Sequence, residues 1–164
     1  MFFINNFNSS GAYYMHIMSN IQGIDLENLE KKVMRSGAYS TLVPAVRAPV
    51  SLLESGPRCW REWQRAASIA GDRAVVKYTV PGPMTMMDGM VDLHYKEDSL
   101  LAGDLVKCIN QELLALVKAG CKHVQIDEPV LEHLKNCWNR NIEKRPTSQQ
   151  LVTFFEETLC LYSA

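Results

Sequence analysis

Apolar residues fall into two short runs and one long helical pattern in the second half of the chain. Residues 74–80 are rich in β-branched and aromatic side chains, and residues 123–126 form a second short run, so both are predicted to be strands. Between them, residues 100–119 repeat apolar positions at helical spacing, with Ser99 as the expected N-cap and Gly120 as the stop. The face expected to be buried consists of Leu101, Leu105, Cys108, Glu112 and Leu116.

The first half of the chain has weaker patterns. Asp25 is placed to cap a helix over residues 25–35, whose apolar face would carry Leu26, Leu29 and Val33. Residues 42–50 are apolar but are interrupted by two prolines, which favours an irregular strand. Residues 58–70 have tryptophan and alanine at spacings of three and four, which predicts another helix. Residues 1–23 show no clear period, so we expect a loosely ordered lead-in.

The order strand, helix, strand over residues 74–126 predicts a parallel pair of strands joined by a right-handed crossover. Such a unit belongs to an α/β fold, either an open sheet or a barrel. In both architectures the loops that follow the C-terminal ends of the strands carry the ligand site. Here these loops are residues 81–85 and 127–129, and they are expected to share one edge of the sheet.

Three residues in these loops, Asp127, Thr85 and Gly82, are candidates for binding a substrate. Of the adjacent carboxylates Asp127 and Glu128, one can face the site, where it is suited to a substrate ammonium or to a role as a base, while the other pairs behind it. The alternative is that Asp127 caps the following helix and Glu128 is solvated. Thr85 offers a hydroxyl to a ligand or to a turn. Gly82, between two prolines, permits a close approach of the backbone to a flat ligand or serves only a rigid turn.

Composition narrows the choice of partners. The chain has 164 residues and a formal net charge of −1, which suits one domain and gives no electrostatic reason to expect a nucleic-acid partner. No apolar run approaches the roughly 20 residues of a membrane span, and the first residues lack the pattern of a signal peptide. Five cysteines at irregular spacing favour reduced thiols in the cytoplasm.

A metal site is not expected from this chain. Cys121 and His123 form a Cys-x-His pair, but a zinc ion would need two further ligands. The nearest alternatives, His133 and Cys137, stand four residues apart without a recognisable second pair.

Three blocks of this sequence resemble the cobalamin-independent methionine synthase family. They are the strand and Gly-Pro-x-Thr turn at residues 76–85, the Ala-Gly-Cys helix end at residues 119–121 and the Val-Gln-Ile-Asp-Glu-Pro run at residues 124–129. The resemblance covers about residues 41–131. It implies a (β/α)8 barrel that transfers a methyl group from a methyltetrahydrofolate to homocysteine or another small thiol, which zinc activates. It also implies that Asp127 binds the homocysteine amino group.

The sequence departs from the family pattern at several positions. The His-x-Cys motif and the further cysteine that hold zinc in the family do not follow Pro129, a glutamate is replaced by His133, and Gly89 stands where the family has a tryptophan. We therefore assign no catalytic or metal-binding residue and expect no methyl transfer by this chain alone. It is expected to form an incomplete (β/α)8 (TIM) barrel fragment whose open sheet edges permit self-association. The alternative is a truncated or fused non-catalytic remnant or interaction module.

The end of the chain resembles a different family. Residues 134–159 carry Cys-Trp and Arg-Pro-Thr at the spacing found in the last helices of a protein kinase domain, but the other kinase motifs are absent from the sequence. We predict a helix, a turn and a second helix capped by Ser148. The expected organisation is a lead-in at 1–23, a partial barrel at 24–131 and a helical tail at 132–164.

Overall fold

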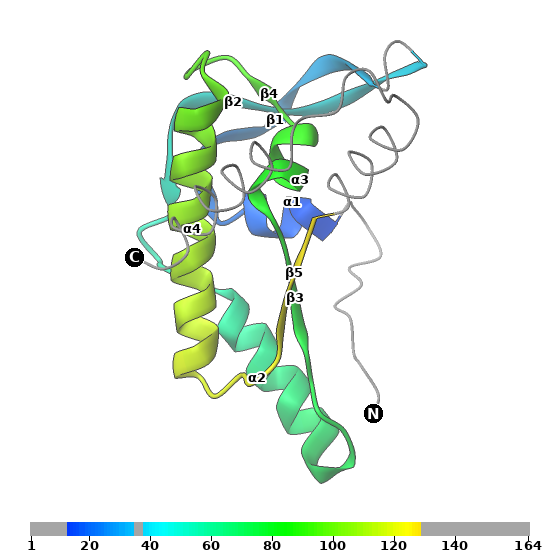
Figure 1. Ribbon diagram of the computed structural model, residues 1–164, viewed down its shortest axis with the longest axis vertical. Helices are drawn as coiled ribbons and strands as arrows, with labels where there is room; N and C mark the ends of the chain where they lie inside the picture. The colour runs from blue at the N-terminus through cyan, green and yellow to red at the C-terminus, as the bar shows by residue number, and fades with distance from the viewer. Residues whose placement is uncertain (1–12, 35–37, 129–164) are drawn as a thin grey trace, which may run out of the picture.

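Two small sheets and a long helix organise the protein. The computed structural model describes residues 13–34 and 38–128. One sheet has the order β1-β2-β4, and the other pairs β3 with β5 (Figure 1). The strands are β1 (Ile21–Met34), β2 (Tyr39–Leu52), β3 (Tyr78–Pro81), β4 (Val91–Asp92) and β5 (Val124–Asp127). The helices are α1 (Tyr13–Met18), α2 (Cys59–Ala70), α3 (Pro83–Asp88) and α4 (Asp98–Lys118), with a 3-10 turn, η2, at Gly71–Arg73.

The predicted strand–helix–strand unit is present. β3 and β5 are parallel, with Tyr78 opposite Val124 and Pro81 opposite Asp127. The connection between them contains α3, β4 of the other sheet and α4, and α4 runs alongside the pair (Figure 1). β3 is shorter than predicted because residues 74–77 precede its first pairing with β5. The chain is therefore a mixed α/β protein in which the C-terminal ends of two parallel strands lie side by side.

The helix predicted over residues 25–35 is wrong, because residues 25–34 are part of strand β1. β1 pairs antiparallel with β2 in a long hairpin, and the register shifts between Asp25 and Glu30. The Asp25 carboxylate does accept two main-chain N–H groups, from Glu27 and Asn28 at 2.9 Å, as a helix cap would. Those bonds form a local turn at the irregularity of β1. Cross-strand pairing with β2 outweighs the helical spacing, and Val33 stays 62% exposed.

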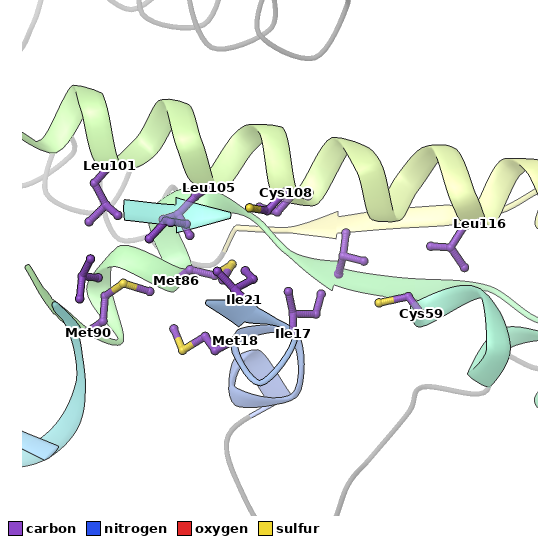
Figure 2. Close-up of a cluster of buried hydrophobic side chains, with 14 of the residues drawn as sticks. Ile17, Met18, Ile21, Cys59, Met86, Met90, Leu101, Leu105, Cys108 and Leu116 are labelled. Carbon is purple, nitrogen blue, oxygen red and sulfur yellow. The ribbon is translucent and has the colours of Figure 1, made fainter. Parts of the chain in front are cut away.

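The lead-in predicted for residues 1–23 is also wrong where the structure describes it. Residues 13–18 form α1, and Ile17, Met18 and Ile21 are almost fully buried. These three side chains pack into the main core, facing α4 and α3 (Figure 2). The lack of a clear period in this segment concealed this role.

Helix α4 supplies one side of that core. Its whole predicted face is buried. In Figure 2, Leu101 and Leu105 lie on the side of Met86 and Met90, while Leu116 lies on the side of Cys59. The predicted cap is wrong: α4 begins at Asp98, and the Ser99 hydroxyl donates to the Glu97 carboxylate at 2.7 Å instead of capping the helix. Among the described residues, no helix combines the length and the apolar character needed to cross a bilayer.

Glu112 is the polar member of the buried face of α4, with 1% of its surface exposed. Its carboxylate accepts the main-chain N–H groups of Arg58 and Cys59 at 3.0 Å and the Asn20 side-chain amide at 2.7 Å. Arg58 and Cys59 are the first residues of α2, whose N–H groups have no partner within the helix. Glu112 therefore joins α4 to the start of α2, and this satisfies a charge that would otherwise be costly to bury.

Candidate functional site

The candidate site lies at the C-terminal ends of β3 and β5. Pro81 and Asp127 are opposite each other in the parallel pair, and the Gly82 N–H donates to the Asp127 main-chain carbonyl at 3.0 Å. α3 begins at Pro83, the first position of a helix, where proline is favoured because its missing N–H would have no helical partner. The turn into α3 and the end of β5 are thus held side by side, as the sequence predicts.

Glu128 binds the first turn of α3. Its carboxylate accepts the N–H groups of Met84 at 2.9 Å and Thr85 at 2.8 Å. The Thr85 hydroxyl donates to the same carboxylate at 2.6 Å. The expectation of a solvated Glu128 is therefore wrong. A carboxylate is stabilised here by three donors and by the positive end of the short helix.

The three predicted substrate-binding residues are brought together, but their side chains face different partners. Thr85 is 7% exposed and its hydroxyl is used by Glu128. Gly82 lies under the Glu128 side chain: a Cβ at Gly82 would stand 2.1 Å from Glu128 Oε1. Within residues 13–34 and 38–128, no hydrogen bond or ion pair engages the half-buried Asp127 carboxylate. The alternative role of Asp127, as a cap of the next helix, falls outside the described residues.

A cleft of about 560 Å³ is lined by Met84 of the same turn and by Lys32 of the hairpin. Its lining is rich in methionine and also carries lysine and aspartate. The lining residues are Lys32, Met84, Met87, Asp88, Met90, Val91, Asp92, Lys96, Asp98 and Leu101. Because Met84 lines the cleft while its N–H binds Glu128, the cleft and the strand-end site share a wall.

Lys32 closes one side of this cleft and was missed in the sequence. Its ammonium donates to three main-chain carbonyls at the end of α3, those of Met87 at 3.1 Å, Asp88 at 2.8 Å and Met90 at 2.8 Å. Burial lowers the pKa of Lys32, and the nearby Asp88 carboxylate acts in the opposite direction. No local sequence pattern could identify Lys32, because the residues that it contacts lie more than fifty positions away in the sequence.

Gly89 stands at the position where the resemblance places a tryptophan. The aromatic ring of Tyr14 lies against Gly89. A Cβ at Gly89 would lie 2.9 Å from Cε2 of Tyr14 in α1. The φ of Gly89 is −83°, so its backbone does not require glycine. Glycine is needed here because the Tyr14 ring occupies the space of a side chain. The chain thus places an aromatic residue beside position 89 from a different element.

The residues that the structure describes do not fit a zinc ion. They contain no group of three His, Cys, Asp or Glu side chains arranged to hold a metal. Burial raises the pKa of Cys108 to about 11 and raises that of Cys59 further, which disfavours the thiolate form that zinc binds. The Cys121 thiol donates to the main-chain carbonyl of His123 at 3.4 Å. His133 and Cys137 lie outside the described residues.

The parallel pairing of β3 with β5, with α4 alongside, defines an α/β protein, and in this class ligands bind at the C-terminal ends of the strands. The chain matches the family described as "Cobalamin-independent synthase, Catalytic domain" over residues 17–146. It therefore belongs to this family. The match starts within α1 and is wider than the 41–131 span of the sequence motifs.

Individual relatives agree with this assignment. A methionine synthase from Saccharolobus islandicus is 46% identical over 56 residues, which are 34% of this chain and 17% of that protein. A methionine synthase from Sulfurisphaera tokodaii is 43% identical over 61 residues, 37% of this chain and 18% of that protein. A B12-independent methionine synthase from a Shewanella species, solved in complex with selenomethionine, is 28% identical with a TM-score of 0.64; the similarity covers 76% of this chain and 35% of that chain. The chain thus spans about a third of the solved relative.

Proposed function

We propose that this chain carries the amino-acid-binding part of a methyltransferase of the cobalamin-independent methionine synthase type. Its acceptor would be homocysteine, or another small thiol that carries an amino group. The observation that carries this proposal is the Asp127 carboxylate, which is half-buried at the strand ends and has no partner among the described residues. Membership of the family supports the assignment of the reaction.

Asp127 would bind the substrate ammonium through a charge-assisted hydrogen bond, which fixes orientation as well as adding affinity. Its backbone is held by the Gly82 N–H at 3.0 Å and by the parallel pairing with Pro81. A carboxylate on a rigid strand end loses little conformational freedom when the substrate arrives. The amino acid would then lie over the turn into α3, with its thiol directed away from Asp127.

The methyl donor, a methyltetrahydrofolate, would enter through the methionine-lined cleft. Flat aromatic rings suit a lining of this kind, because methionine adapts its shape and makes favourable contacts between sulfur and aromatic rings. Lys96 in the lining would face the acidic end of such a ligand. Zinc, which activates the thiol in this family, has no fitting set of ligands among the described residues, so we assign none of them to it.

β3 and β5 would be two successive strands of a (β/α)8 barrel. The parallel pairing and the α4 crossover support this, and so does the similarity to the solved relative. Ile126 of β5 is 41% exposed, which suits contact with a further element of such a barrel or with a second copy of the chain.

The proposal is tested by titrating reduced L-homocysteine into the wild-type chain and into Asp127→Asn. Asparagine keeps the shape and removes the charge, so the affinity should fall roughly tenfold, which corresponds to about 1.4 kcal/mol. The matched control is Asp72→Asn in the exposed 3-10 turn η2. A second ligand, 4-mercaptobutyrate, lacks the ammonium and should not distinguish Asp127→Asn from wild type. Equal homocysteine affinities for the two proteins would contradict the proposal.

A further inference from the structure

We infer that Glu128 is a positioning residue: it acts on the substrate through Asp127, by clamping the end of β5 to the turn into α3. This inference rests on the proposed function of Asp127. Glu128 itself faces away from a ligand, because its carboxylate is used by the N–H groups of Met84 and Thr85 and by the Thr85 hydroxyl.

The geometry joins the two adjacent acidic residues to one turn by two separate sets of bonds. The main-chain carbonyl of Asp127 accepts the Gly82 N–H at 3.0 Å and lies 3.4 Å from the Thr85 hydroxyl. One residue later, the Glu128 side chain binds the next two N–H groups along the turn. Movement of the end of β5 away from the turn would break both sets. The position of the Asp127 backbone, from which its carboxylate projects, is thus held from both sides.

Gly82 gives independent support for this role. Its φ is −81° and its ψ is 168°, a conformation that any residue adopts, so the backbone does not demand glycine. A Cβ there would stand 2.1 Å from Oε1 and 2.3 Å from Cδ of Glu128. Glycine at this position therefore admits the Glu128 side chain across the turn. The Gly-Pro-x-Thr turn and the Asp-Glu pair thus form one hydrogen-bonded unit.

Glu112 provides a matched control within the same chain. It also accepts two successive N–H groups at the start of a helix, those of Arg58 and Cys59 in α2. It belongs to α4 and makes none of its bonds to β5 or to the turn before α3. Loss of either clamp should reduce stability. Only loss of the Glu128 clamp should change how an amino acid binds to the folded protein.

The test compares Glu128→Gln with Glu112→Gln in the full chain. In both variants a side-chain NH2 replaces an oxygen that accepts an N–H, so both should lower the urea midpoint. The affinity of the folded protein for L-homocysteine should fall roughly fivefold in Glu128→Gln and stay at the wild-type value in Glu112→Gln. The affinity for 4-mercaptobutyrate should stay unchanged in both. Thr85→Val, which removes one donor of the clamp and keeps its shape, should weaken homocysteine in the same direction; Thr85→Ser, which keeps the hydroxyl, should restore it.

Two outcomes would overturn the inference and leave the proposed function intact. The first is wild-type homocysteine affinity in folded Glu128→Gln, or in Thr85→Val if the glutamine variant does not fold, while Asp127→Asn still weakens binding. The second is an equal loss of affinity in Glu112→Gln, which would indicate general loosening of the protein. An unchanged affinity in Asp127→Asn would instead overturn the proposed function, and the inference with it.

Discussion

The Glu112 carboxylate accepts the main-chain N–H of Cys59 at 3.0 Å, inside a core where Glu112 is almost fully buried. Cys59 opens α2 and Glu112 lies in the middle of α4, so one side chain fixes the packing of the two helices. An apolar residue at position 112 would fill the same space but would leave the N–H groups of α2 without acceptors. Helix α2 thus depends on a residue more than fifty positions away.

Replacing Glu112 should therefore be costly. Glu112→Gln should lower the free energy of unfolding by about 2 kcal/mol, because it leaves a buried donor facing an N–H group. Urea denaturation followed by circular dichroism would measure the change. Glu54→Gln, at an exposed position before α2, is the control and should stay within about 0.5 kcal/mol of wild type. Equal midpoints for the two variants would show that Glu112 does not hold α2.

Two neighbouring lysines in β1 should respond differently to the same substitution. Lys32→Met removes an ammonium that binds three carbonyls at the end of α3, so unfolding should become easier by about 1–2 kcal/mol. Lys31→Met changes an exposed residue on the opposite face of the hairpin and should have little effect. Amide exchange would locate the loss: protection should fall around residues 87–90 in Lys32→Met alone. Unchanged protection there would contradict this role of Lys32.

The pair of His16 and Glu62 should make stability depend on pH. The hydrogen bond with Glu62 is the main cause that raises the pKa of His16 above its ordinary value of 6.5. A raised pKa in the folded state means that the contribution is fully present below pH 6.5 and is lost as pH rises through the raised value. His16→Gln should therefore cost most below pH 6.5.

Urea midpoints of wild type and His16→Gln at about pH 5.5 and pH 8.5 would measure this, since these values lie on either side of the ordinary histidine range. The difference between the two proteins should shrink at the higher pH. His94→Gln, at an exposed position, is the control and should give the same difference at both values. A difference in urea midpoint between wild type and His16→Gln that increases with pH would contradict the predicted direction of the pH dependence.

The purified chain should bind no stoichiometric zinc. The sequence shows no two paired ligand motifs, and the described residues contain no cluster that fits a metal. Elemental analysis after dialysis would measure the zinc content directly. One zinc ion per chain that is lost in a Cys121→Ser, His123→Gln double variant would contradict this prediction.

The sequence was sufficient for the parts of the fold that are governed by local pattern. The 3.6-residue spacing of α4 identified its buried face, including Glu112, because a single helix face must be apolar to pack. The β-branched run ending at Val80 and the turn residues that follow it identified the β3–α4–β5 unit. That unit alone placed Asp127 next to the Gly82 turn, since parallel strands joined by one crossover bring their C-terminal ends together.

The tertiary structure decided what local pattern could not. Residues 25–34 have helical spacing, yet they form β1 because β2 supplies a partner for their main-chain groups, and such pairing is invisible in a local window. Lys32 was unremarkable in sequence, and the partners of Glu128 could not be identified there, since the contacts of both residues lie more than forty positions away. The sequence by itself thus determined which strand ends meet and which two carboxylates stand there. Only the folded chain decided that Glu128 turns inward to hold α3, while the Asp127 carboxylate has no partner among the described residues, because that depends on where donors from distant segments converge.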